Sequence, residues 1–212
     1  MTPPIIIIGG GGHGRVILDA LLCVSAPVIG IVDPDPGVAG NLPRGVPWLG
    51  GEEVLLRYPP ETHRLANGIG GIGEPRRHAA FERFVAAGYG FVGVRHPSAT
   101  VACDVALADG CQIMAGAVVQ TGAKIGANAI VNTRASVDHD CIVGEHCHVA
   151  PGAVLCGDVT VGAGTHVGAG AVVIQGVRVG RFSIIGAGAV ILSDVPDHMV
   201  VVSERKRRER PS

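Results

Sequence analysis

A strict six-residue repeat in the second half of the chain limits the possible folds more than any other feature. From Val101 to Ile191, every sixth residue is valine, isoleucine or leucine, and the register never slips. The residue four places after each is small or β-branched, and glycine often follows the aliphatic residue. The aliphatic positions are Val101, Leu107, Ile113, Val119, Ile125, Val131, Val137, Val143, Val149, Leu155, Val161, Val167, Val173, Val179, Ile185 and Ile191.

The repeat suits a chain that winds in short strands joined by tight turns. An inward aliphatic residue followed by a turn with a small inward residue can recur indefinitely, and glycine supplies turn dihedrals that other residues resist. One such coil buries little surface, so its stability comes from the coils stacked on it. The chain has 33 glycines and only 3% aromatic residues, which suits a core of small and aliphatic side chains. We therefore predict stacked coils over residues 98–198 rather than a β-sandwich.

Residues 1–97 have the pattern of a small Rossmann-like α/β domain, in which short apolar runs alternate with helical segments. We expect Val16, Leu18, Leu21 and Leu22 to face the sheet, and His96-Pro97-Ser98 to mark the domain boundary. The expected strands are 5–8, 28–32, 65–69 and 89–94, and the expected helices are 15–22, 52–57 and 74–87.

A glycine-rich loop follows the first expected strand. Gly9, Gly11 and Gly14 satisfy G-x-G-x-x-G, and Asp33 lies about twenty residues further on, as in dinucleotide-binding proteins. The segment is too short for two mononucleotide-binding halves and leads directly into the repeat, which argues against NAD. Backbone N–H groups at the helix start can still hold a phosphate or carboxylate. The alternative is a loop that only makes a tight strand-to-helix turn.

Composition excludes several classes of protein. The net charge is −1, so nothing global indicates nucleic acid or a membrane surface as partner. No apolar run approaches the ~20 residues that span a bilayer, and the N-terminus lacks the pattern of a signal peptide, so we expect a cytoplasmic protein. The six cysteines form no C-x-x-C pair, so small buried fillers are favoured over zinc ligands.

These features occur together in a known order: the glycine loop with His13, the strand end at Asp33, the loop at Gly70, and Val137-x-His139-Asp140-Cys141 within the repeat. The chain resembles the sialic-acid O-acetyltransferases and bacterial UDP-amino-sugar N-acetyltransferases of bacillosamine and perosamine synthesis. The resemblance extends from Ile5 to about Val200. It implies a left-handed parallel β-helix with three hexads per coil, a homotrimer, and acetyl-CoA in the groove between adjacent helices.

The resemblance also assigns roles to residues of the repeat. It implies that His139 is the catalytic base and that Asp140 raises its basicity; the alternative is that His139 is an ordinary turn residue. The unperturbed pKa of an imidazole, ~6.5, is close to neutral pH, so the ring can accept a proton there. The residues implied for acetyl-CoA are His148 near the thioester, the Gly157 amide at the oxyanion, and backbone near Ala169, Gly186 and Ala187.

The acceptor residues implied are mostly in the first domain. They are Gly11, Gly12 and His13 for the sugar or its phosphates, Asp33 and Pro34 for the nucleotide, Gly70 in the third loop, and Asn132, which is equally well an inert turn residue. We expect His146 in solvent and His166 stacked one coil beyond His148. Such stacking also occurs at the metal of γ-class carbonic anhydrases, but the histidine spacing differs, so we expect no metal.

One departure concerns the C-terminus. The family's Gly-x-Pro-Ala-Lys-like segment is missing, and residues 199–212 read as a basic, solvated tail or, less readily, as a contact for the CoA 3′-phosphate. The function predicted is acetyl transfer from acetyl-CoA to an amino group of a nucleotide-linked deoxyamino sugar in bacterial surface-glycan synthesis. The alternatives are O-acetylation of sialic acid or a related sugar, a non-catalytic trimeric ligand-binding scaffold, and a metal-dependent hydratase.

Overall fold

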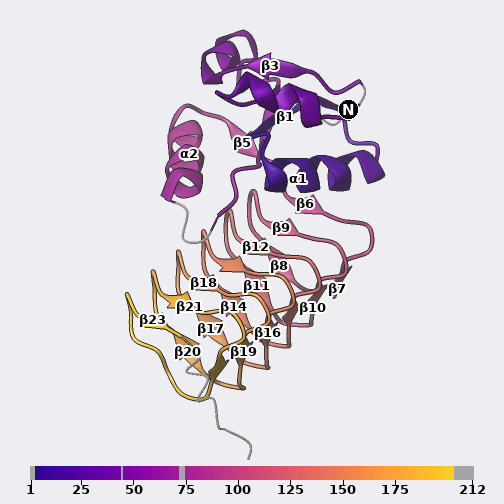
Figure 1. Cartoon of the computed structure of the whole chain (residues 1–212). Helices are drawn as coiled ribbons and strands as arrows, with labels where there is room; N and C mark the ends of the chain where they lie inside the picture. Colours follow the sequence, from indigo (N-terminus) through magenta and orange to yellow (C-terminus); the bar gives the residue numbers. More distant parts are fainter. Residues whose placement is uncertain (1–2, 44, 72–74, 203–212) are drawn as a thin grey trace, which may run out of the picture.

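A computed structural model describes residues 3–43, 45–71 and 75–202. The first domain is a parallel sheet in the order β3-β2-β1-β4-β5 with helices on its faces (Figure 1). No helix in these ranges is both long and apolar enough to cross a membrane. The strands are β1 (Ile5–Ile8), β2 (Val28–Val32), β3 (Trp48–Gly50), β4 (Arg64–Asn67) and β5 (Gly90–Phe91), and the helices are α1 (Gly12–Cys23), α2 (Pro75–Ala86) and the 3₁₀ segments η1 (Pro36–Asn41) and η2 (Glu52–Arg57).

Strand β1 is the centre of this sheet because it is apolar on both faces. All four of its isoleucines are buried, as expected for a parallel strand covered on both sides. Helix α1 buries Ile17, Leu18 and Leu21, whereas Val16 and Leu22 are each 43% exposed. The prediction that Val16 and Leu22 face the sheet was wrong, because the 3.6-residue period places positions 14, 17, 18 and 21 on one helix face.

Other expected bounds also differ. Helix α1 begins at Gly12, within the glycine loop, and the strand expected over 65–69 is β4. The expected helix 74–87 is α2; Glu74 lies outside the described residues. Sequence analysis missed β3, a short half-buried strand that carries little apolar signal. The segment expected as one strand over 89–94 divides into β5, in the α/β sheet, and β6 (Val94–Arg95), which pairs with the repeat.

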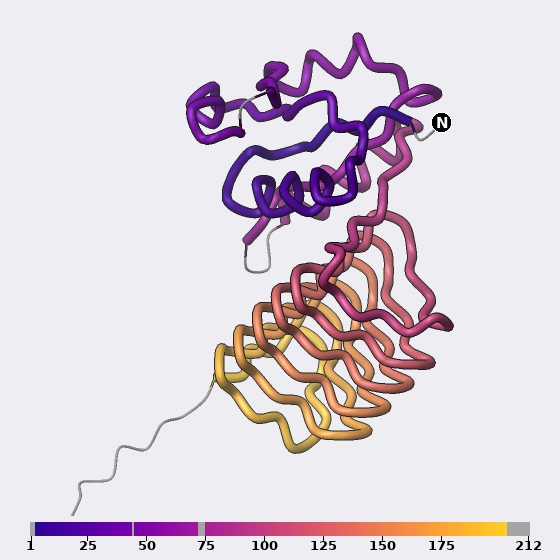
Figure 2. The backbone as a smooth tube through the Cα atoms, turned by 90° about the vertical axis from the view of Figure 1, so that its right-hand side faces the viewer, coloured from indigo at the N-terminus to yellow at the C-terminus, as the bar shows by residue number. Residues whose placement is uncertain are grey.

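The repeat forms three parallel sheets that are the faces of a prism, a left-handed parallel β-helix (Figures 1 and 2). Paired residues are 18 apart in sequence from β9 to β22, as His148 and His166 are, so each coil contains three hexads. Sheet I consists of β6, β9 (Gln112–Ile113), β12 (Ile130–Val131), β15 (His148–Val149), β18 (His166–Val167), β21 (Ile184–Ile185) and β23 (Val200–Val201); sheet II of β7 (Thr100–Val101), β10 (Val118–Val119), β13 (Ser136–Val137), β16 (Val154–Leu155), β19 (Val172–Val173) and β22 (Val190–Ile191); sheet III of β8 (Ala106–Leu107), β11 (Lys124–Ile125), β14 (Ile142–Val143), β17 (Thr160–Val161) and β20 (Arg178–Val179).

The prism is filled by the predicted aliphatic and small residues, nearly all of which are buried in one continuous cluster. Leu107 is an exception at 41% exposed, because its coil is the first and has a stacked neighbour on one side only. Two inward positions are polar but satisfied: Thr165 Oγ1 donates to Gly180 O at 2.6 Å, and Ser183 Oγ donates to Pro196 O at 3.0 Å.

The two domains share a core where they meet. Ile17 and Leu18 of α1 belong to the same buried cluster as Val94, Met114 and Ile130 of the first coils of the prism. Figure 1 shows α1 lying between the α/β sheet and the start of the prism, with α2 beside it. The α/β domain therefore stands on one end of the prism rather than on a flexible linker.

Candidate active site

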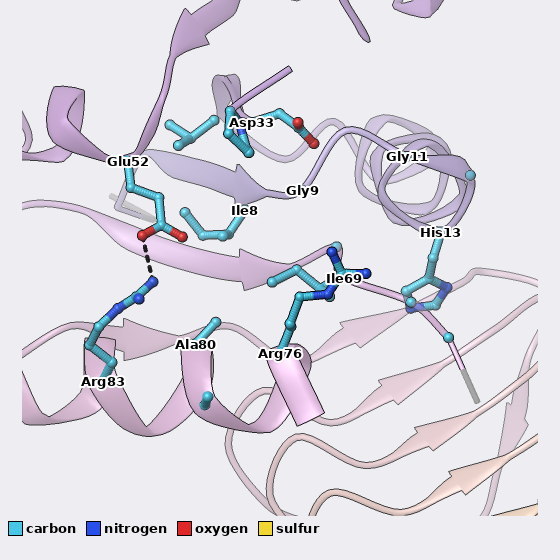
Figure 3. A pocket seen from close by; sticks show the side chains of 17 residues that line it. Ile8, Gly9, Gly11, His13, Asp33, Glu52, Ile69, Arg76, Ala80 and Arg83 are labelled. Carbon is cyan, nitrogen blue, oxygen red and sulfur yellow. Dashed lines mark hydrogen bonds and ion pairs between the residues drawn. The ribbon is translucent and has the colours of Figure 1, made fainter. Parts of the chain in front are cut away.

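The described residues form a cavity of about 610 Å³ at the carboxyl ends of β1, β2 and β4. In the sheet order β3-β2-β1-β4-β5, the chain runs from β1 to β2 and β3 on one side and then crosses back to β4 on the other side of β1. Open α/β sheets bind ligands at such a reversal of strand order. Figure 3 shows His13 and the glycine loop on one side, with side chains of α2 across from the strand ends. Of the predicted acceptor residues, Gly11, Gly12, His13, Asp33, Pro34 and Gly70 line this cavity.

The glycine loop is held by Asp33. One carboxylate oxygen accepts the Gly10 N–H at 2.7 Å and the other accepts the Asp35 N–H at 2.9 Å. A Cβ at Gly14 would lie 2.0 Å from Gly9 O, so helix and strand approach too closely for any side chain. Both ends of the sequence motif therefore have a structural role in shaping the cavity.

Sequence analysis missed the charged wall of the cavity. Arg76 and Arg83 project from α2 toward the strand ends, and Arg83 Nη2 forms an ion pair with Glu52 Oε2 at 2.5 Å (Figure 3). The two arginines are seven residues apart, so an amphipathic reading of this helix would have placed them on one face. Arg76 and the Arg83–Glu52 ion pair therefore make this side of the cavity polar and charged, opposite the glycine loop.

His13, which lines the cavity from α1, contacts Gln112 of the prism. Its Nε2 lies 2.7 Å from Gln112 Oε1. Burial, followed by the nearby Arg77 guanidinium, lowers the pKa of His13 from 6.5 to about 4, so the ring is neutral at physiological pH. A Cβ at Gly70 would lie 2.7 Å from His13 Cβ, so the third loop can pass this close only because residue 70 is glycine.

A second group of predicted residues surrounds His148 on β15. Asn132 Nδ2 lies 3.0 Å from His148 Nε2, and His148 Nδ1 is 3.4 Å from Gly71 O. His166 pairs with His148 one coil further on in sheet I, which confirms the prediction that the two lie above one another on one face; their rings meet edge to face, with centroids 4.9 Å apart. Burial, then His166 and His13, lower the pKa of His148 from 6.5 to about 3. Both rings line a smaller cavity of about 170 Å³.

His139 lies elsewhere, on the II/III corner, where the chain passes from sheet II to sheet III after β13. Its Nδ1 is 2.9 Å from Asp140 Oδ2, so the carboxylate accepts the Nδ1 proton and Nε2 keeps its lone pair. This hydrogen bond is the main cause of a raised pKa for His139. The side chain is 47% exposed, so the imidazole is open to a ligand.

Gly157 lies one coil beyond His139. A Cβ at this position would lie 2.4 Å from His139 Nε2 and 2.5 Å from Cε1, so the ring occupies the space above the glycine. The remaining predicted CoA residues are on the I/II corner, where the chain leaves sheet I. There Ala169 O accepts the Gly188 N–H at 2.9 Å, and a Cβ at Gly168 would lie 2.6 Å from Ala187 N.

The structure therefore divides the predicted residues among four places in one chain. The predicted acceptor residues other than Asn132 gather in the α/β cavity, and His148 with Asn132 lies on and beside sheet I. His139 and Asp140 are on a different corner from Ala169, Gly186 and Ala187, and they line neither cavity.

The expectation that His146 is solvated was wrong. Its side chain is only 6% exposed; Nε2 is 3.2 Å from Glu82 Oε1, and its ring stacks on His78 with 3.7 Å between centroids. His146 lies where the chain passes from sheet III to sheet I, and helix α2 packs against it there. This contact between distant segments is not visible in the sequence. Asn128 Oδ1 accepts a hydrogen bond from Asn67 Nδ2, so the Asn128 atom that faces His146 is its NH₂ group. Asn128 Nδ2 therefore donates to His146 Nδ1 at 2.9 Å, and the proton of the neutral His146 ring is on Nε2.

That tautomer bears on the question of a metal. His78, Glu82 and His146 place one ligand atom each within 4.8 Å of one another, but a metal at His146 Nε2 would require the proton to move to Nδ1, where it would meet the Asn128 amide. Of the segment expected as a basic tail over 199–212, the structure describes residues 199–202. Val200–Val201 forms β23 and pairs with β21, and residues 203–212 lie outside the described ranges.

A prism of hexapeptide coils with an exposed histidine–aspartate pair, joined to a glycine-loop cavity, defines a hexapeptide-repeat acyltransferase. Residues 4–83 match the PglD N-terminal domain, and residues 122–157 and 158–193 match the bacterial transferase hexapeptide (six repeats). The chain belongs to the family of sugar acetyltransferases that combine these two parts.

Solved structures with both parts are similar over almost the whole chain. PerB from Caulobacter crescentus, in complex with CoA and GDP-perosamine, is 38% identical with a TM-score of 0.85, covering 94% of each chain. A histidine-to-alanine variant of the GDP-perosamine N-acetyltransferase from this organism is 36% identical with a TM-score of 0.86, covering 96% of this chain and 95% of that one.

The acetyltransferase domain of PglB from Neisseria gonorrhoeae, in complex with acetyl coenzyme A, is 34% identical with a TM-score of 0.85, covering 94% of this chain and 96% of that one. No curated protein matches the chain.

Proposed function

We propose that the chain transfers an acetyl group from acetyl-CoA to an amino group of a nucleotide-linked deoxyamino sugar in bacterial surface-glycan synthesis, with His139 as general base. The observation that carries the proposal is the His139–Asp140 hydrogen bond, which leaves Nε2 as the free base on an exposed corner. The similarity to proteins crystallised with CoA and GDP-perosamine or with acetyl coenzyme A supports the donor and the class of acceptor.

The proposed chemistry needs one base and one donor to the oxyanion. The acceptor amine attacks the thioester carbonyl carbon while His139 Nε2 takes the amine proton, and Asp140 stabilises the resulting imidazolium. General-base help of this kind is worth about 10²–10⁴-fold in rate. The Gly157 N–H would stabilise the tetrahedral oxyanion. Breaking of the C–S bond then releases CoA as its thiolate, which takes up a proton.

The α/β cavity suits the nucleotide part of the acceptor. Its glycine loop at the start of α1 offers backbone N–H groups that fit a diphosphate, and Arg76 and Arg83 lie on the facing wall, where Arg83 is paired with Glu52. Asp33 and Pro34 would lie near the nucleotide and Gly70 near the sugar. His13, and Asn132 through His148, would orient the amine.

The proposed site requires a second copy of the chain. His139 and the CoA-binding backbone at Ala169, Gly186 and Ala187 are on different corners of one prism, so they can meet only when one copy's corner faces another's. We propose a homotrimer with acetyl-CoA in the grooves between prisms and its thioester near His148. A cytoplasmic location stays a prediction.

The test is release of CoA by the purified protein with GDP- and UDP-linked 4-amino-deoxysugars. We expect turnover with an amine acceptor and a loss of about 10²–10⁴-fold in His139→Ala, with His63→Ala as a control histidine outside the cavity. Turnover only on hydroxyl sugars such as sialic acid would replace N-acetylation by O-acetylation. Wild-type rates in His139→Ala would refute the assignment of the base.

Subunit mixing tests the shared site. If His139 serves the acceptor cavity of a neighbouring copy, co-assembled His139→Ala and His13→Ala chains leave about one site in four with neither change, so activity returns. If both residues served the same chain's site, mixing would restore nothing.

A further inference from the structure

A wholly buried glutamine connects the prism to the acceptor cavity. Gln112 lies on β9 with no exposed surface. Its Nε2 donates to the backbone Asn67 O at 2.8 Å, and its Oε1 lies 2.7 Å from His13 Nε2. Neither the sequence pattern nor the roles proposed above assign this residue a function.

The two contacts together fix where the proton of His13 lies. Asn67 O is a backbone carbonyl and can only accept, so the Gln112 atom facing it must be the NH₂ group. Gln112 Oε1 therefore faces His13 and can only accept as well. Consequently, His13 Nε2 carries the hydrogen of that bond, and a neutral ring then has a bare Nδ1.

The ring is neutral because of what surrounds it. His13 is largely buried, and the charged or titratable groups that act on it are the Arg77 guanidinium and the neighbouring His148; both disfavour a positive charge on His13 or on the pair. No described residue hydrogen-bonds to His13 Nδ1. A lone pair is therefore what the ring can offer a ligand in the cavity it lines.

His148 has the opposite tautomer by the same reasoning. Asn132 Oδ1 accepts the Thr133 N–H at 2.7 Å, so its Nδ2 is the group that donates to His148 Nε2. The hydrogen of His148 is then on Nδ1, facing Gly71 O at 3.4 Å. The two buried histidines thus differ: His13 keeps a free acceptor, and His148 keeps a donor in a long hydrogen bond.

We propose that Gln112 is a positioning residue that holds His13 in the Nε2–H tautomer, so that His13 Nδ1 accepts an N–H from the acceptor amine and orients its lone pair for attack. The assignment of an amine as the ligand rests on the proposed function, whereas the tautomer does not. The cavity would accordingly select acceptors that present a hydrogen-bond donor at this point and discriminate against a group that can only accept.

The direct test is nitrogen-15 NMR of the whole protein labelled in histidine, with the His13 signals assigned by their loss in His13→Asn while the other histidine signals stay in place. We expect the unprotonated nitrogen of His13 to be Nδ1 in the wild type, and the preference to relax toward a mixture in Gln112→Met. A wild-type ring with its proton on Nδ1 would overturn the proposal, and this measurement needs no substrate.

Kinetics test the consequence. Gln112→Met should raise KM for the amino-sugar acceptor about tenfold through loss of one oriented hydrogen bond, while KM for acetyl-CoA stays unchanged. The matched control is Ile113→Val, the neighbouring residue, which is buried in the prism core. An acceptor KM within twofold of wild type in folded Gln112→Met would overturn the proposal, as would equal changes in both KM values.

The carboxylate variant supplies a readout that a purely structural role would not give. In Gln112→Glu, the new carboxylate would accept the Nε2 proton and stabilise the imidazolium of His13, so Nδ1 would become a donor at neutral pH. We expect acceptor KM to be raised at neutral pH and to recover as pH increases; a pH-independent KM would contradict the mechanism. Absence of acetyl transfer by the wild type would refute the proposed function and leave the NMR result standing.

Discussion

Gly157→Ala is the sharpest test of the geometry around the base. The added Cβ would lie 2.4 Å from His139 Nε2, whereas ordinary contacts begin at 3.4 Å, so the ring must move by about 1 Å. A misplacement of that size can cost about 10²-fold in rate, equivalent to about 2.7 kcal/mol of transition-state stabilisation. Alanine keeps the backbone N–H, so the effect isolates the position of the ring from any role of the amide at the oxyanion.

The assay is steady-state acetyl transfer together with thermal unfolding. We expect kcat/KM to fall by about 10²-fold with little change in Tm, because the displaced imidazole is half-exposed and can move into solvent. Gly40→Ala is the matched control, since a Cβ at Gly40 meets nothing within 4 Å. In a His139→Ala background, Gly157→Ala should have no further effect on rate. A Gly157→Ala rate within threefold of wild type would refute the placement of His139 Nε2 as the working base.

Three further outcomes are expected. Asp140→Asn removes the charge that raises the pKa of His139, so the acid limb of kcat/KM should move to lower pH while the plateau falls; an unmoved limb would contradict the pairing. His13 and His148 have pKa values of about 4 and about 3 in the folded chain against 6.5 in the unfolded one, so the stability that they contribute should be complete above pH 6.5 and decline as pH falls through this interval, by roughly 3 kcal/mol for His13 alone. Denaturant unfolding from pH 7 to pH 4 measures this decline, and His13→Asn should reduce it while the contribution of His148 remains. Iodoacetamide should label exposed Cys23 and Cys103 at neutral pH well before buried Cys111, Cys141 and Cys147, whose pKa values burial raises to about 11, 11 and 12; equally fast labelling of all five would contradict the described packing.

The repeat was predictable because every coil repeats the same requirement. Each inward position must be apolar and small enough to stack, so the register of the sequence is the register of the sheets. Leu107 keeps this register but is exposed, because it has a stacked neighbour on one side only. The cavity of the α/β domain was predictable for a related reason. Parallel strands bring their carboxyl ends to one edge, so residues following β1, β2 and β4 had to be neighbours.

The contacts that could not be predicted depend on how the α/β domain docks on the prism. Gln112 and His13 are 99 residues apart, and nothing local to either marks their contact. The burial of His146 depends on where α2 meets the prism, as does the position of Arg77, which donates to Asn67 O and Asn128 O. Side chains of this kind satisfy buried backbone groups of another domain, and such needs appear only after both domains are in place.

Because the α/β domain is fixed to the first coil, the distance from its cavity to any position on the prism depends on the number of coils between them. Sheet I runs without interruption from β6 to β23, and each coil advances by one strand spacing of about 4.8 Å. Duplicating or deleting 18 residues would add or remove one coil. Every inward position would be preserved, but all later corners would move by one strand spacing relative to the cavity. Coil number, rather than side-chain identity, is thus a variable by which such a scaffold can set the distance between the cavity at its end and a site on its side.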